Sequence, residues 1–279
     1  NNAIKHGTVA FEIKSGYGLD LATEIKMLEV VQMLKEKFPS EIKSTFLGAH
    51  DFPSEYKDDR DAYVDLICNE MIPEVAKQKL AEYCDAFVDK GYYTIEQGRK
   101  IFETAKKFSM QIRTHADELA WVRAAELAAE VGAKSADHLL FVSDEGIEAM
   151  KNNNVVATML PGTSFFIRLP YANARKIIDS GAIVALATDC NPGSSFNENM
   201  QMVLWLATLN LKMSMEESLV ASTLNAAYSM DLHHKLGSIE VGKEASFLIL
   251  DTQSYKEMFY HYGHNHISKI FIKGQEYLG

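Results

Sequence analysis

Short apolar runs alternate with longer amphipathic segments along this chain, and this pattern most constrains its fold. Runs such as Val155–Leu160 and Ala182–Leu186 have the length and composition of buried strands in a parallel sheet. The intervening segments have helical spacing, as in Leu21 to Leu34. The alternation occurs about seven times and predicts an α/β fold, with a parallel sheet that is open or closed into a barrel.

Individual helices are predicted from capping and spacing signals. Thr94 with Gln97 three residues later is typical of a capping box at the start of a helix. An Ala-rich helix is expected over Leu119–Val131, and one or two helices over Ala62–Leu80 with a break near Pro73.

Three polar groups follow predicted strands at the point where each strand ends. These groups are Thr114–Glu118, Ser135–His138 and Ala187–Gly193. Side chains at the carboxyl ends of parallel strands lie around one end of a barrel, and barrel enzymes have their active sites at that end. His115, Glu118, His138 and Asp189 therefore form a candidate metal-hydrolase site, because imidazole and carboxylate are suitable metal ligands.

Each group also has an ordinary structural interpretation. The segment from His115 to Glu118 suits the first turn of a helix, where Asp117 and Glu118 favour the positive end of the dipole. The Asp189–Gly193 segment suits a turn after a strand. His138 could be a buried structural histidine. Only the joint placement at strand ends favours a site. Asp89, in contrast, is expected in a solvated loop without a role.

Composition limits the classes of partner. The chain has 279 residues, enough for one barrel-sized domain, and a net charge of −10, which argues against nucleic acid or an anionic membrane as partner. No apolar stretch approaches the ~18 residues needed to span a bilayer. The start of the chain shows no signal-peptide pattern. Three cysteines without a CxxC pair indicate reduced thiols in a cytoplasmic protein.

The pattern changes near the end of the chain. Leu236–Lys243, Ala245–Leu250 and Ile267–Ile272 have the composition of short strands. We expect a catalytic domain over residues 1–235 and a small β unit over residues 236–279. His264 and His266 are assigned to this β unit.

Several stretches resemble imidazolonepropionases, and the tail is similar to that of the amidohydrolase superfamily. The stretches are Glu12–Leu19 (EIKSGYGL), Thr45–His50 (TFLGAH), His115–Glu118 (HADE), Ser135–Leu139 (SADHL), Met159–Gly162 (MLPG) and Ala185–Gly193 (ALATDCNPG). The resemblance covers nearly the whole chain. It implies a metal-dependent (β/α)8 TIM barrel with part of a small β-sandwich at the C-terminus. It also implies a homodimer.

The resemblance implies an activity. Imidazolonepropionases hydrolyse the cyclic amide of the small molecule 4-imidazolone-5-propanoate to N-formimidoyl-L-glutamate in histidine degradation. They use one divalent or trivalent metal ion, zinc or iron. By matching positions, His115 and Asp189 are metal ligands, and Asp189 also takes the proton of the attacking water. Glu118 contacts the substrate ring and assists the water, and His138 lies near the scissile carbonyl. The implied substrate contacts are Tyr17, His50, Glu118, Asn191, Gly193 and Ser194.

One feature of the family is not found in this sequence. The family has an H-x-H metal motif on its first barrel strand and then a substrate-binding Arg, whereas this chain begins near what resembles the second strand. The one H-x-H, His264-Asn265-His266, lies in the β unit and does not match that motif. We therefore expect a family member that lacks its N-terminal portion. Two alternatives are a different cyclic-amide or deaminating amidohydrolase, and a catalytically inactive fragment.

Overall fold

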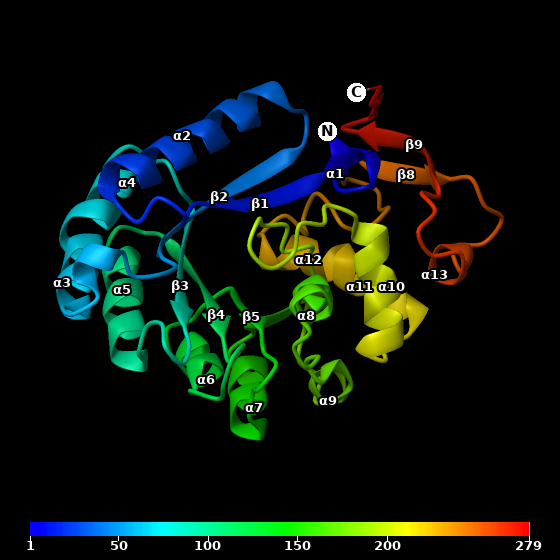
Figure 1. The fold of residues 1–279 in the computed structure, drawn as a ribbon. Coiled ribbons are helices and arrows are strands. Elements are labelled where there is room, and N and C mark those ends of the chain that lie inside the picture. Colours follow the sequence, from blue (N-terminus) through cyan, green and yellow to red (C-terminus); the bar gives the residue numbers. More distant parts are fainter. Residues whose placement is uncertain (279) are drawn as a thin grey trace. The chain divides into compact units, whose positions relative to one another are not determined.

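The computed structural model describes residues 1–278, which fall into two compact units. The first unit is Phe11–Ala157, and the second joins Asn1–Ala10 to the residues from Thr158 onward. Figure 1 traces both by colour along the chain. We describe each unit separately.

Parallel strands form the centre of the first unit, and they are hydrogen-bonded in chain order. β2, β3, β4 and β5 pair in parallel, and β1 and β6 cross the borders of the unit. The strands are β1 (Ala10–Lys14), β2 (Glu41–Ala49), β3 (Tyr83–Val88), β4 (Gln111–Ala116), β5 (Ser135–His138) and β6 (Val156–Met159). The predicted α/β class and parallel sheet are confirmed. The complete eight-stranded barrel remains a prediction.

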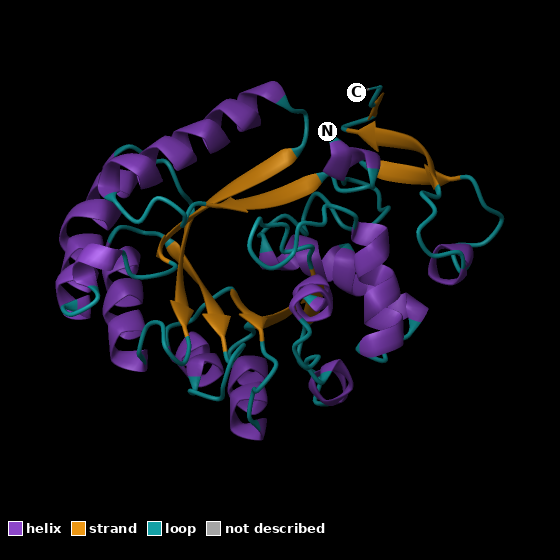
Figure 2. Cartoon of the chain, in the orientation of Figure 1, coloured by secondary structure: helices purple, strands orange, loops and turns teal. Residues whose placement is uncertain are grey.

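Helices connect these strands and lie along their outer side (Figure 2). The elements are α2 (Leu21–Lys37), the 3-10 turn η1 (Ser54–Tyr56), α3 (Arg60–Leu66), the π-helical turn η2 (Ile67–Met71), α4 (Ile72–Lys77), α5 (Ile95–Lys107), α6 (Ala124–Glu130) and α7 (Asp144–Asn152). The predicted capping box is confirmed at the start of α5, where Thr94 and Gln97 bond reciprocally.

One helix prediction was wrong in its bounds, and another is confirmed. The helix expected from Leu119 begins only at Ala124, because the Asp117 carboxylate accepts backbone N–H groups from the residues before and at the start of the helix. The irregularity expected near Pro73 is confirmed: the π-helical turn η2 separates α3 from α4, and Pro73 lies in the first turn of α4.

The second unit contains the end of β6, the adjacent β7 and a set of helices. Its elements are α1 (Asn2–Lys5), α8 (Pro161–Ile167), α9 (Ala174–Asp179), β7 (Val184–Leu186), α10 (Met200–Asn210), α11 (Met215–Ser222), α12 (Leu224–Ser229) and α13 (Glu257–Tyr260). Ala227, Met230, Leu232 and Leu236 form a small buried apolar cluster around the end of α12.

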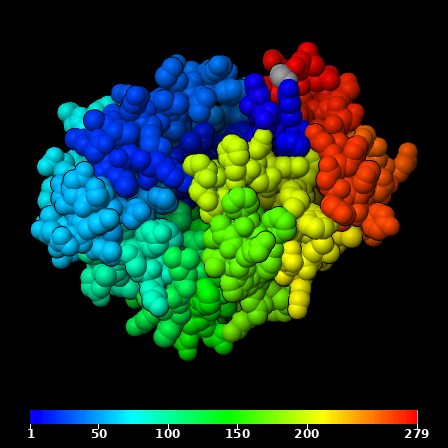
Figure 3. All heavy atoms as spheres, in the orientation of Figure 1, coloured from blue at the N-terminus to red at the C-terminus, as the bar shows by residue number. Residues whose placement is uncertain are grey.

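The tail forms an antiparallel sheet in the order β10-β9-β8, with β8 at Phe247–Leu250, β9 at Ile267–Ile272 and β10 at Gln275–Glu276. The strand predicted over Leu236–Lys243 was wrong, because this segment forms turns. The N-terminal residues lie against this tail (Figure 3), where the Tyr277 hydroxyl donates to Asn1 Oδ1 at 2.8 Å. The domain border at residue 235 and the β-sandwich remain predictions.

Within residues 1–278, the helices lack the combination of length and apolar composition that crossing a bilayer requires.

We predict that Thr94→Ala destabilises the protein by about 0.5–2 kcal/mol, because the Gln97 N–H loses the hydroxyl that accepts it at 3.2 Å. Thr94→Ser keeps that acceptor and is the matched control. Urea unfolding of the three proteins measures the difference. Equal midpoints for the alanine and serine variants would contradict a stabilising role of the cap.

Candidate active site

A row of rings runs across the carboxyl ends of strands β1 to β5. Tyr17 and His50 lie 5.1 Å apart between ring centroids, and the Phe87 ring lies 6.1 Å from His50. The His115 ring lies 5.2 Å from Phe87 and 5.2 Å from His138. Five consecutive parallel strands therefore bring these side chains together at one edge of the sheet.

Strand register explains this alignment. Phe87 of β3 is paired with His115 of β4, and His115 is paired with Asp137 of β5. Because the strands are parallel, residues at the same level near their ends face the same edge. His138 is paired with Ala116, one position beyond His115, and its ring centroid lies 5.2 Å from that of His115. The expectation that the two histidines meet at strand ends is confirmed within the first unit.

His115 is buried against the carboxylate of Asp85. Its Nδ1 lies 3.1 Å from Asp85 Oδ2 and 3.2 Å from Oδ1. Burial by itself lowers the pKa of His115, but the charge and hydrogen bond of Asp85 outweigh burial and raise the pKa to about 9. A proton on Nδ1 that faces Asp85 leaves Nε2 as the nitrogen available to a metal.

Lys14 compensates the buried carboxylates around His115. Its Nζ lies 2.6 Å from Asp85 Oδ2 and 2.8 Å from Asp137 Oδ2. Burial raises the pKa of Asp85, but His115 and Lys14 outweigh it and hold the pKa well below its usual range. Asp85 is therefore a carboxylate held between the Lys14 ammonium and Nδ1 of His115. The sequence interpretation missed both Asp85 and this role of Lys14, although a charged residue within the apolar run of β3 is the signal that could have found Asp85.

Glu118 lies on a loop that Asp89 holds in place. The Asp89 carboxylate accepts the backbone N–H groups of Glu118 at 2.6 Å, Leu119 at 2.9 Å and Ala120 at 3.1 Å. Asp89 is buried, so its assignment to a solvated loop without a role was wrong. Its side chain supplies the acceptor for a loop whose N–H groups have no strand or helix partner.

Two strand-end residues beside this loop have left-handed backbone conformations. Asp117 has φ 50° and His138 has φ 78°, which non-glycine residues rarely adopt. The hydrogen bonds of the Asp117 carboxylate to Val122, Ala124 and Ala125 hold its strained position. His138 Nδ1 is buried without a hydrogen bond and lies 3.4 Å from Glu118 Oε1. The predicted acid and the second histidine are therefore neighbours.

Asp189 lies in the loop after β7, in the second unit. It has φ 49°, and its Oδ2 accepts the Thr163 hydroxyl at 2.5 Å. The Asn191 side chain accepts the N–H groups of Gly193 at 2.9 Å and Ser194 at 2.7 Å. The interpretation of this segment as a turn after a strand is therefore confirmed, and a role of the same residues in binding stays a prediction.

The predicted residues thus form two groups. Tyr17, His50, His115, Glu118 and His138 lie together in the first unit. Asp189, Asn191, Gly193 and Ser194 share one loop of the second.

The first group fits a metal ion on chemical grounds. His115 has the arrangement common to histidine ligands, in which one ring nitrogen binds a carboxylate and the other is available. An imidazole nitrogen of this kind suits zinc or iron.

We predict that Asp89→Ala lowers the free energy of unfolding by at least about 2 kcal/mol, because three N–H groups of the Glu118 loop lose their acceptor. Asp89→Asn retains one oxygen and should have an intermediate effect. Asp58→Ala, at an exposed turn, is the control. Urea unfolding measures stability, and hydrogen exchange at Glu118–Ala120 measures the loop. Unchanged exchange in Asp89→Ala would contradict this role.

Comparisons with known proteins identify the family. Residues 90–277 match the Amidohydrolase family. The imidazolonepropionase of Geobacillus sp. (strain WCH70) is 48% identical over 97% of this chain and 64% of its own length. That of Brevibacillus brevis is 47% identical over 96% of this chain and 63% of its own length. The chain thus spans a little under two thirds of the length of these curated relatives.

Solved structures share the fold. A guanine deaminase from C. acetobutylicum with bound guanine has a TM-score of 0.75 at 17% identity and covers 98% of this chain and 73% of its own. An adenosine deaminase from Xanthomonas campestris with bound zinc has a TM-score of 0.74 at 16% identity, over 98% of this chain and 66% of its own. At such identities the likeness concerns the fold alone. The match over residues 90–277, more than half of the sequence, means that this chain belongs to the amidohydrolase family.

Proposed function

We propose that this protein hydrolyses the cyclic amide of 4-imidazolone-5-propanoate to N-formimidoyl-L-glutamate, as a step of histidine degradation. The observation that carries the proposal is 42–48% identity to proteins named imidazolonepropionase over almost the whole chain. The ring row of the first unit supports it, because flat aromatic and imidazole side chains suit a flat heterocyclic substrate.

A metal ion, zinc or iron, belongs to this proposal. We propose His115 and Asp189 as its ligands. When bound, it would lower the pKa of a water molecule so that hydroxide is available near neutral pH. Asp85 holds His115 with Nε2 available, and Lys14 holds Asp85 in turn.

The carboxylates and His138 manage protons and charge in the proposed reaction. Water adds to the amide carbonyl carbon, the ring C–N bond breaks, and the ring nitrogen leaves with the proton that the water gave up. Asp189 takes that proton from the attacking water, and Glu118 contacts the ring and assists the water by proton exchange. His138, beside Glu118 at 3.4 Å, polarises the carbonyl oxygen.

Five positions bind the substrate in this proposal besides Glu118: Tyr17, His50, Asn191, Gly193 and Ser194. Tyr17 is 53% exposed, and its ring centroid lies 5.1 Å from that of His50 with the rings tilted by 46°. The loop of Asn191 presents its backbone at Gly193, where no side chain obstructs approach.

Location and assembly are further parts of the proposal. The three cysteines carry free thiols, which fits a reducing cytoplasm. The net charge of −10 disfavours nucleic acid and anionic membranes as partners. A homodimer is proposed from family resemblance.

We predict that the zinc- or iron-loaded protein converts 4-imidazolone-5-propanoate to N-formimidoyl-L-glutamate, measured by mass spectrometry. Guanine and adenosine, offered in parallel, should remain unchanged. Hydrolysis of either purine without ring opening of the imidazolone would replace this proposal with a deaminase. Absence of turnover with every substrate, in folded and metal-loaded protein, would leave the inactive-fragment alternative.

We predict that Glu118→Gln lowers kcat by about 10²–10⁴-fold, because the amide cannot exchange a proton with the reacting groups. The fold should survive, since the two side chains have the same shape. Glu145→Gln changes an exposed residue of α7. It is the matched control and should retain the kcat of the unaltered protein. Steady-state kinetics separates kcat from KM. A glutamine variant that loses only affinity would assign Glu118 to substrate binding alone.

A further inference from the structure

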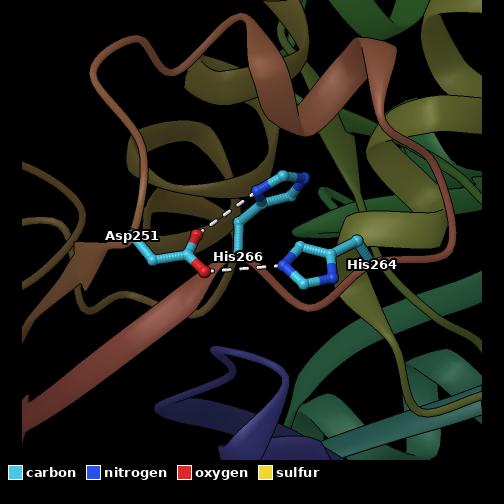
Figure 4. Close-up of side chains that lie close together, drawn as sticks. All are labelled: Asp251, His264 and His266. Atoms are coloured by element: carbon cyan, nitrogen blue, oxygen red, sulfur yellow. Dashed lines mark hydrogen bonds and ion pairs between the residues drawn. The ribbon is translucent and has the colours of Figure 1, made fainter.

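A carboxylate and two imidazoles converge where β8 is followed by the tail loop and where β9 begins (Figure 4). Asp251 directly follows β8, and His264 and His266 directly precede β9. One potential ligand atom from each residue lies within 4.8 Å of the other two. No residue of this cluster takes part in the proposed hydrolysis.

The spacing of the cluster is compatible with a metal site. His264 Nε2 lies within hydrogen-bonding distance of Asp251 Oδ2, at 3.4 Å, and His266 Nδ1 lies 3.4 Å from the other carboxylate oxygen, Oδ1. Tetrahedral zinc with ligands at ~2.0–2.1 Å places neighbouring ligand atoms about 3.4 Å apart. The two imidazoles therefore approach the carboxylate at a separation that neighbouring zinc ligands have.

The second nitrogen of His266 supports this interpretation. Its Nε2 lies 3.3 Å from the backbone carbonyl oxygen of His261. A proton on Nε2 that is donated to this carbonyl leaves a lone pair on Nδ1, the atom that faces Asp251. A backbone carbonyl of this kind commonly orients a metal-binding histidine.

Hydrogen bonds hold the cluster in place from both ends. The Asp251 N–H donates to the His266 carbonyl at 2.9 Å, which ties the end of β8 to the start of β9. The His266 N–H donates to Gln201 Oε1 at 3.1 Å, and Gln201 Nε2 donates to Asn265 Oδ1 at 2.8 Å. Asn265 Nδ2 in turn donates to the Lys5 carbonyl at 3.0 Å. The backbone that carries the ligands is therefore fixed without a metal.

Burial of the cluster gives it one protected and two accessible ligands. His266 is 3% exposed, whereas the side chains of His264 and Asp251 are 45% and 47% exposed. An ion can therefore reach the cluster from solvent, and water can complete its coordination.

We infer that Asp251, His264 and His266 bind a divalent first-row transition ion, with Zn²⁺ as the best match. Two nitrogen donors and one carboxylate suit zinc and disfavour Mg²⁺ and Ca²⁺, which prefer oxygen ligands. The ion joins the end of β8 to the start of β9 and closes the loop that contains α13.

The test measures zinc binding to tag-free protein by competition with a chromophoric chelator. His264→Gln and Asp251→Asn alter exposed side chains, so both variants should fold, which circular dichroism checks. Each should bind zinc at this site at least tenfold more weakly. His234→Gln, an exposed histidine outside the cluster, is the matched control. His115→Gln should retain this zinc, which separates the inference from the proposed active site.

Identical zinc affinity and stoichiometry in His264→Gln and His234→Gln would overturn the site. Limited proteolysis tests the role of the ion in closing the loop. Zinc should slow cleavage between residues 252 and 263 in the unaltered protein and in His234→Gln, but not in His264→Gln. Zinc that binds without slowing cleavage would overturn that role.

Discussion

The Asp85 carboxylate is the interaction on which the polar centre of the first unit depends. A buried carboxylate is costly unless it is paired and hydrogen-bonded. Asp85 meets this condition through Lys14 Nζ at 2.6 Å and His115 Nδ1 at 3.1 Å. Because Lys14 also binds Asp137, one cation connects the interiors of β1, β3 and β5. The orientation of the His115 ring follows from this pairing.

The loops at the strand ends share one feature. After each of these strands, a polar side chain accepts backbone N–H groups that are not bonded within a strand. Asp89 does so for Glu118–Ala120, Asp117 for the start of α6, and Asn191 for Gly193 and Ser194. These loops are thereby held by local hydrogen bonds, and small changes in the acceptors should move the side chains that the loops carry.

His115 and the pair His264 and His266 are held by different kinds of contact. His115 is buried, paired with a carboxylate and linked to a cation, and its Nε2 remains available. His264 and His266 precede β9, the central strand of the small sheet, and their partners are the Asp251 side chain and a backbone carbonyl.

The sequence by itself determined most strands and helices, because apolar spacing and capping residues act locally; the late start of α6 and the turns over Leu236–Lys243 are the exceptions. It also placed His115, His138 and Asp189 in the polar groups where predicted strands end. Tertiary structure decided which polar groups meet. Lys14 is separated from Asp85 by 71 positions, and Asp251 from His264 by 13. Asp85 and Asp89 contact their partners only because neighbouring strands pair. The spacing of residues along the sequence does not indicate which strands pair. The physical reason is that burial and charge pairing depend on neighbours in space, whereas periodicity records only neighbours along the chain.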